Sequence, residues 1–227
     1  DKLYLTNSYF SYVKIGEGCK NNCSYCAIPL IRGTLVSYPK EDIFKEVEQS
    51  IANGRNEIVL IAQDTTAYGY DIYDSYRIHN LIEDVLKING VKNVRLLYLY
   101  PDEVSDELIE LFSKEKRLIS YFDLPLQHIN NKLLFDMNRR GSKEEIIRLI
   151  QKIRSKVEDV IIRTTFIVGY PGETEEEFQA TYNFLEKIKL TKMHVFKYSP
   201  REGTRAALMQ NQIDGNIKEQ RSEKLIK

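Results

Sequence analysis

The sequence YVKIGEGCKNNCSYC, residues 12–26, decides the fold. Its first part, Tyr12–Gly16, is a short apolar run of the kind that forms a buried strand. Its second part is a loop with the spacing CxxxCxxC, which places Cys19, Cys23 and Cys26 within eight positions. A strand that leads directly into a loop of metal-ligating side chains predicts the first unit of a βα fold, provided that similar units follow.

Five more units follow along the chain. The expected strands are rich in Val, Ile, Leu, Phe and Tyr: Ile58–Gln63, Val94–Tyr100, Tyr121–Leu126, Val160–Val168 and Met193–Tyr198. Apolar residues at helical spacing predict the helices Lys40–Ala52, His79–Lys87, Glu103–Ser113, Lys143–Lys156 and Glu175–Ile188, with a weaker, polar pattern over Asn216–Ile226. Proline, which cannot donate to a strand ladder, stands at or just past four strand ends, as Pro101, Pro125, Pro171 and Pro200.

Six strands that alternate with helices predict an α/β fold with a mainly parallel sheet. In such folds the carboxyl ends of the strands carry the active site. Since a complete barrel needs about eight units, we expect an open, partial (β/α)6 TIM-like barrel.

Composition narrows the class of protein. The chain has 227 residues, 42% of them hydrophobic, which suffices for a sizeable core and excludes disorder as the main state. Its 33 Lys and Arg residues balance 33 Asp and Glu residues, so charge gives no reason to expect nucleic-acid binding, which stays open. No apolar run approaches the ~20 residues of a membrane helix, so we expect no membrane partner.

The three cysteines predict metal ligation. An odd number of cysteines, all within one loop, does not suit a disulfide framework. A structural zinc site needs about four ligands, and the candidates His79, His128 and His194 all lie far away in sequence. A [4Fe–4S] cluster with three cysteines keeps one iron open for a ligand that is not protein. Zinc and inert buried thiols remain as alternatives.

Five charges stand inside apolar strands: Lys14, Arg95, Asp123, Arg163 and Lys197. Alternate residues of a barrel wall face inward, so we expect these side chains to face the interior. They form either ion pairs on the barrel floor or a polar cavity for a charged cofactor.

The chain resembles the radical S-adenosylmethionine (SAM) superfamily, and within it the methylthiotransferases. The resemblance rests on the cysteine loop and on the segments RLLYLYP (95–101), DLPLQHI (123–129), MNRRG (137–141) and FIVGYPGE (166–173). It covers nearly the whole chain. It implies a partial (β/α)6 barrel that binds a [4Fe–4S] cluster and SAM and generates a 5′-deoxyadenosyl radical.

The segment QDTTAYG (63–69) resembles the branch that methylthiolates an aspartate of a small-subunit ribosomal protein. This resemblance implies a cytoplasmic transferase, with that ribosomal protein as substrate and a reducing electron donor such as flavodoxin or ferredoxin. A tRNA methylthiotransferase of the same superfamily is one alternative. A metal-stabilised binding module without catalytic activity is another.

Members of this family carry an N-terminal domain with three further cysteines for a second [4Fe–4S] cluster, and a C-terminal β-barrel, the TRAM domain. We therefore expect residues 1–227 to be the radical SAM core domain, a fragment without either neighbour. The second cluster then belongs to the full-length protein only.

The resemblance also implies residue roles. Cys19, Cys23 and Cys26 are the cluster ligands. Tyr25 covers the cluster or the adenine, or is a core tyrosine. Gln63 and Asp64, which end the second strand, contact the methionine amino group of SAM, or form a turn.

Three further positions are implied on later strands. Gln127 and His128 end the fourth strand, where ribose contacts are usual, although His128 is equally compatible with a structural role. Arg163 suits the SAM carboxylate, because a guanidinium pairs with a carboxylate bidentately, unless it pairs with Asp123. Gly169 belongs to a tight loop that lets the backbone approach the adenine, or to a plain turn.

The doublet Arg139 and Arg140 is interpreted as a solvated basic face, open to an acidic substrate or to ribosomal RNA.

Overall fold

The computed structural model describes residues 9–226, so residues 1–8 and 227 of the expected domain lie outside the described part. Six strands form the wall: β1 (Phe10–Lys14), β4 (Glu57–Ile61), β5 (Asn93–Leu96), β6 (Tyr121–Gln127), β7 (Ile161–Val168) and β8 (Lys192–Lys197). Each overlaps a strand expected from the sequence. Their β-branched and aromatic side chains suit a surface that is packed by helices on one side.

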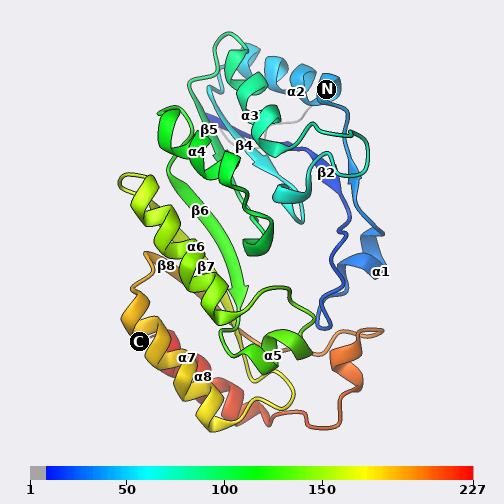
Figure 1. Ribbon diagram of the computed structural model, residues 1–227. Helices are drawn as coiled ribbons and strands as arrows, with labels where there is room; N and C mark the ends of the chain where they lie inside the picture. The colour runs from blue at the N-terminus through cyan, green and yellow to red at the C-terminus, as the bar shows by residue number, and fades with distance from the viewer. Residues whose placement is uncertain (1–8, 227) are drawn as a thin grey trace.

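The wall consists of two parallel sheets that meet at a seam. One has the strand order β1-β4-β5 and the other β6-β7-β8. At the seam, Val94 forms an isolated bridge with Leu118, and the Leu99 amide donates to the Asp123 carbonyl at 2.9 Å. Figure 1 shows the strands as an open arc rather than a closed barrel, as the sequence predicts.

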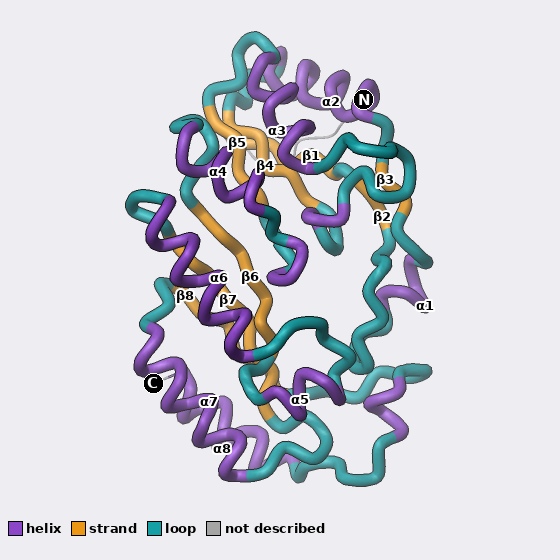
Figure 2. Tube along the Cα trace, in the orientation of Figure 1, coloured by secondary structure: helices purple, strands orange, loops and turns teal. Residues whose placement is uncertain are grey.

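Helices cover the outer side of this arc (Figure 2). The long ones are α2 (Lys40–Ala52), α3 (Ile78–Lys87), α4 (Asp106–Lys114), α6 (Lys143–Lys156), α7 (Glu175–Ile188) and α8 (Gly215–Ile226). Between them lie α1 (Ile28–Arg32), α5 (Asn131–Asp136), the hairpin strands β2 (Gly16–Glu17) and β3 (Val36–Ser37), and the 3₁₀ helices η1 (Thr65–Ala67), η2 (Pro101–Glu103) and η3 (Arg205–Leu208). These short elements were not expected from the sequence.

Helix starts follow their capping residues. The Ser105 hydroxyl accepts from the Leu108 amide, which starts α4 after η2 rather than at Glu103. Ser142 and Thr174 form complete capping boxes with Glu145 and Glu177 at the starts of α6 and α7. Each cap satisfies amide groups that the first helical turn leaves free.

The core lies between the strands and the helices. Alternate strand residues such as Ile58, Leu60, Val94 and Phe122 are fully buried there. The rings of Phe122 and Phe112 pack at a centroid distance of 4.2 Å and join β6 to α4. This packing fixes the carboxyl ends of the strands, where the site is built.

The alternation of side chains along each strand also shows whether the five charged strand residues face the barrel interior, as expected. Arg95 pairs with Glu57 at 2.9 Å and Arg163 with Asp123 at 2.8 Å, so the interior face carries ion pairs. Lys14 lines the cavity described below.

The expectation for Lys197 was wrong. Lys197 pairs in register with Val168 and forms an ion pair with Glu219 on α8, on the outer side. Phe196 takes the opposite face of β8 because successive side chains alternate.

Candidate functional site

A cavity of about 430 Å³ opens at the carboxyl ends of β1, β4, β5 and β6. All three cysteines line it, together with Tyr25, Gln63 and Gln127 from the sequence-based set. Its volume falls within the ~300–1,000 Å³ of ordinary ligand sites. The structure therefore brings six of the ten expected site residues to one cavity.

The cysteine loop leaves the β2–β3 hairpin at Gly18. A Cβ atom on Gly18 would lie 2.0 Å from the Thr34 carbonyl oxygen, and its φ of +67° favours glycine. The Cys19 amide then donates to the Gly33 carbonyl at 3.3 Å. Only glycine permits this approach of the two hairpin arms, which starts the loop beside β1.

The far end of the loop is held by the second half of the barrel. Buried Ser24 donates through its hydroxyl to the Asp136 carbonyl at 2.8 Å and lies 2.7 Å from the Tyr170 hydroxyl. The Ser24 amide donates to the Met137 carbonyl at 2.9 Å. The loop therefore spans from the first sheet to α5 and β7.

Burial and local N–H donors act in opposite directions on the cysteine thiols. Burial raises the pKa of the Cys19 thiol, and burial likewise raises the pKa of the Cys26 thiol. The backbone amide of Ile28 lies 3.4 Å from the Cys26 sulfur, and the Asn21 side-chain amide lies 3.6 Å from the Cys19 sulfur. These donors compensate part of the burial and would stabilise thiolates, the form that binds metal.

Within residues 9–226, no three His, Cys, Asp or Glu side chains lie close enough together to hold one metal ion. A structural zinc ion needs about four convergent ligands. A cubane cluster instead takes each thiolate on a different iron, so its ligands stand further apart. The three thiols around one cavity therefore fit a cluster.

Gln63 provides an open polar atom. Its Nε2 lies 3.4 Å from Glu17 Oε1, whereas its buried Oε1 has no hydrogen-bond partner in the described part of the chain. Buried polar atoms are nearly always paired, so this acceptor fits a bound ligand that donates. An ammonium group such as that of SAM has this property.

Asp64 does not line the cavity. It is buried, and its carboxylate accepts from the Asn21 side-chain amide at 2.7 Å and from the Thr66 hydroxyl. Burial raises the pKa of Asp64. The structure thus gives this residue protein partners beneath the cysteine loop.

The interpretation of Arg139 as part of a solvated face was wrong. Its side chain is buried and lines the cavity, with its guanidinium 3.9 Å from the Tyr100 ring centroid. Nη2 donates to the Pro125 carbonyl at 2.6 Å, and Nη1 lies 4.0 Å from the Cys23 sulfur. No carboxylate among the described residues forms an ion pair with Arg139. Only Arg140 is exposed, paired with Asp102 and Glu103.

Aromatic side chains close the cavity around this cation. Tyr25 lines it and also packs against a hydrophobic cluster that includes Tyr170 and Tyr198, and its role beside the cluster or the adenine stays a prediction. Burial raises the pKa of Tyr25 well above its usual value, and burial also raises the pKa of Tyr100. Both phenols are therefore neutral rings beside the cavity, able to shield a bound group from water.

Two lining residues have left-handed backbone. Gln127 has φ of 69° at a register shift between β6 and β7, and Tyr98 has φ of 61°. Both line the cavity. Such conformations cost about 1–3 kcal/mol and cluster at functional sites. Here they turn side chains at the ends of β5 and β6 into the cavity.

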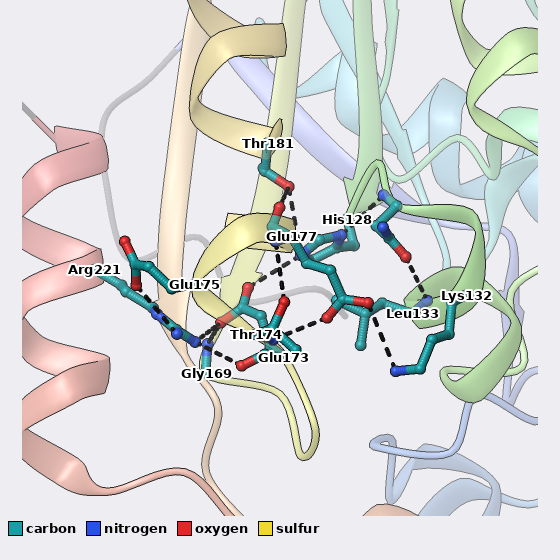
Figure 3. Close-up of polar contacts among 11 residues, drawn as sticks. His128, Lys132, Leu133, Gly169, Glu173, Thr174, Glu175, Glu177, Thr181 and Arg221 are labelled. Atoms are coloured by element: carbon teal, nitrogen blue, oxygen red, sulfur yellow. Dashed lines mark hydrogen bonds and ion pairs between the residues drawn. The ribbon is translucent and has the colours of Figure 1, made fainter. Parts of the chain in front are cut away.

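His128 occupies a different, fully paired environment (Figure 3). Its Nδ1 accepts from the Asn130 amide at 3.0 Å, so its Nε2–H donates to Glu173 Oε1 at 3.0 Å. Glu173 also accepts from the Gly169 amide at 2.6 Å and from Arg221 of α8 at 2.6 Å. Both ring nitrogens of His128 thus have protein partners, and its ribose contact stays a prediction.

Gly169 and Arg163 also lie outside the cavity lining. A Cβ on Gly169 would lie 2.3 Å from Lys218 Cγ, so the glycine lets the end of β7 approach α8. Arg163 is engaged by Asp123, its other interpretation. Neither contact involves the cavity, and the cofactor roles of both residues stay predictions.

Several cavity residues escaped the sequence analysis: Asn21, Tyr98, Tyr100 and Arg139. Tyr98 and Tyr100 stand just before Pro101, and strand-end position was the signal that could have found them. The burial of Arg139 has no such signal, since it depends on contacts with segments distant in sequence.

The profile of the Radical SAM superfamily matches residues 13–185, and the chain belongs to this superfamily. It is 50% identical over 226 residues to the ribosomal protein uS12 methylthiotransferase RimO of Clostridium botulinum strain Hall, which covers 100% of this chain and 51% of the relative. The RimO of Clostridioides difficile strain 630 is 46% identical over 221 residues, 97% of this chain and 50% of its own. The chain thus spans about half the length of these relatives.

Solved structures show the same fold. The methyltransferase TsrM of Kitasatospora setae, with cobalamin and a [4Fe–4S] cluster bound, gives a TM-score of 0.72 at 16% identity, over 87% of this chain and 38% of that one. Streptococcus suis SuiB bound to S-adenosylmethionine gives 0.63 at 17% identity, over 95% and 46%. These likenesses confirm the partial barrel. No helix within residues 9–226 is long and apolar enough to cross a membrane.

Proposed function

We propose that this chain is a radical SAM core domain that binds a [4Fe–4S] cluster through Cys19, Cys23 and Cys26 and uses SAM to methylthiolate an aspartate of ribosomal protein uS12. The observation that carries the proposal is one cavity, at the strand ends of a partial barrel, that all three cysteines line. The identity of 50% to a uS12 methylthiotransferase along the whole chain supports the substrate.

The cavity residues suit SAM. The unpaired Gln63 Oε1 accepts a hydrogen bond from the amino group of SAM, and the buried Arg139 guanidinium pairs with its carboxylate. A buried cation without a carboxylate partner destabilises the fold, so a bound carboxylate would offset that cost. We prefer Arg139 to Arg163 for this role because Arg163 is already paired with Asp123. Gln127 lines the same cavity, and we propose that it contacts the ribose.

A cluster held by Cys19, Cys23 and Cys26 would supply one electron to SAM, which would give methionine and a 5′-deoxyadenosyl radical able to take a hydrogen atom from the substrate. The protein holds the reactants together and excludes water, and Tyr25 and Tyr100 contribute apolar wall. The electron donor we propose is a flavodoxin or ferredoxin. A ribosomal protein substrate places the reaction in the cytoplasm.

All three cysteines of the printed sequence belong to this loop, so these residues leave none for a second cluster. We propose that residues 1–227 act as the radical-generating domain, and that the second cluster and the TRAM domain belong to the full-length protein.

The test is anaerobic reconstitution with iron and sulfide, followed by SAM and dithionite. We expect brown protein that releases 5′-deoxyadenosine, while mass spectrometry finds uS12 unmodified by this stretch alone. A triple Cys→Ala variant of Cys19, Cys23 and Cys26 is the control. Colourless, zinc-containing protein without 5′-deoxyadenosine would refute the proposed function, and methylthiolated uS12 would refute the division of roles.

A further inference from the structure

Asn21, between the first two cysteines, contacts three segments through one amide group. Its Nδ2 lies 2.7 Å from Asp64 Oδ2 and 3.6 Å from the Cys19 sulfur. Its Oδ1 accepts from Arg140 Nη2 at 2.9 Å. This single side chain therefore connects the cysteine loop to the end of β4 and to the segment between α5 and α6.

Asp64 fixes the orientation of that amide. The carboxylate is 2% exposed, and it accepts from Asn21 on one oxygen and from the Thr66 hydroxyl on the other. Thr66 is itself held, since its hydroxyl oxygen accepts from the Tyr100 amide at 3.1 Å. Because an ionised carboxylate only accepts, Asn21 must turn its NH₂ group toward Asp64, and its second N–H then points at Cys19.

We propose that Asp64 and Asn21 are a positioning pair that holds an N–H donor on the Cys19 sulfur, and thereby sets the placement of this ligand and the reduction potential of the cluster. The inference rests on the proposed cluster. Hydrogen bonds to ligand sulfurs raise the potential of iron–sulfur centres, because they stabilise the added negative charge. Asp64 thus acts on the centre through Asn21 and without contact to SAM.

An exchange of residues 21 and 64 separates the effect on the placement of Cys19 from the effect on the reduction potential of the cluster. In the double variant Asn21→Asp with Asp64→Asn, the amide at 64 donates to the carboxylate at 21, and Thr66 and Arg140 keep their partners. The N–H on the sulfur is lost and a carboxylate oxygen takes its position, so the variant also needs a control for added charge. Asn21→Asp alone sets two carboxylates against each other, and Asp64→Asn alone lacks the acceptor that orients the amide.

We expect both single variants to bind less than half of the wild-type iron, and the double variant to bind the full amount. An anaerobic redox titration followed by electron paramagnetic resonance should give the double variant a more negative potential. The expected change is about tenfold in the equilibrium constant for reduction, or ~59 mV for one electron. Asn22→Asp, a carboxylate at the exposed next position, is the control for added charge and should shift the potential less.

A second measurement uses the cluster-free protein. Mass spectrometry of iodoacetamide-treated samples gives the alkylation rate of Cys19 relative to Cys26. This ratio should differ from wild type in both single variants. Wild-type iron content in the single variants, or a wild-type potential in the double variant, would overturn the inference. Wild-type protein without iron would refute the proposed function instead, while the alkylation ratio still tests the pair.

Discussion

Two buried polar regions lie near the strand ends, and they differ in how their charged groups are paired. Around Glu173, the carboxylate accepts from His128, the Gly169 amide and Arg221, and Arg221 Nε is the atom left open. Around the cavity, Gln63 Oε1 has no partner within residues 9–226 and Arg139 has no carboxylate. The first region therefore holds its charges in ion pairs within the protein, whereas the second leaves an open acceptor and a cation that fit a ligand.

The largest expected effect is on the cavity side. Cys23→Ala should reduce bound iron from about four atoms per chain to nearly none, because two thiolates do not hold a cubane with an open iron. Iron and acid-labile sulfide assays after reconstitution measure this loss. The urea stability of the cluster-free variant should stay near wild type. Retention of the full iron content would exclude the cluster assignment.

A substitution in the region around Glu173 should lower the stability of the fold. Glu173→Gln removes the buried charged partner of Arg221, which is 6% exposed and then keeps only the exposed Glu175 at 3.3 Å. It also turns an amide N–H toward His128 Nε2–H. We expect the free energy of unfolding of the cluster-free protein to fall by ~1.5–3 kcal/mol in urea denaturation. Adding Arg221→Met should recover part of the loss. Unchanged stability in the single variant would contradict the role of Glu173 as scaffold.

Arg139→Met, in contrast, should lower the affinity for SAM without lowering the stability of the fold. SAM binding to reconstituted protein, measured by anaerobic equilibrium dialysis, should weaken ~10–100-fold, the range for a lost hydrogen bond to a charged group. The stability of the cluster-free protein should stay equal or rise, because a buried charge without a carboxylate is removed. Arg163→Met is the matched control. If Arg163→Met loses SAM affinity and Arg139→Met keeps it, the carboxylate belongs to Arg163.

The smallest expected effect comes from a helix start far from the thiols. Ser142→Ala removes the hydroxyl that accepts from the Glu145 amide at 3.3 Å. The free energy of unfolding should fall by about 1 kcal/mol in urea denaturation. Iron content should match wild type, and Ser142→Thr, which keeps the hydroxyl, should restore stability. A loss of iron in Ser142→Ala would show that α6 also shapes the cavity.

The sequence predicts this fold well because its long elements are periodic. The six wall strands and the helix over 40–52 follow directly from apolar spacing. The elements that it misses, such as α1 and the β2–β3 hairpin, have two to five residues each, too few to show a period. Lys197 was misplaced because one residue of register decides which face a strand side chain takes.

The site residues that could be predicted are those marked by a short sequence motif or by their position at a strand end. The cysteine spacing and the strand-end positions of Gln63 and Gln127 led to the cavity. Arg139 and Asp64 did not follow, because their burial and partners come from other segments. The sequence of an arginine doublet does not show whether one guanidinium is buried, as in Arg139, or both are exposed to solvent.

The anchoring of the cysteine loop has a consequence for how the protein matures. The Asn138 side chain donates to the Asn22 carbonyl across 116 positions, and Ser24 meets Tyr170 across 146 positions. Contacts between such distant segments form late, because closing a long loop costs entropy before the contact repays it. The thiols, synthesised early in the chain, therefore reach their final arrangement only after β6, α5 and β7 have folded. A cluster that requires all three thiols in this arrangement would therefore assemble on the folded barrel rather than on the unfolded chain.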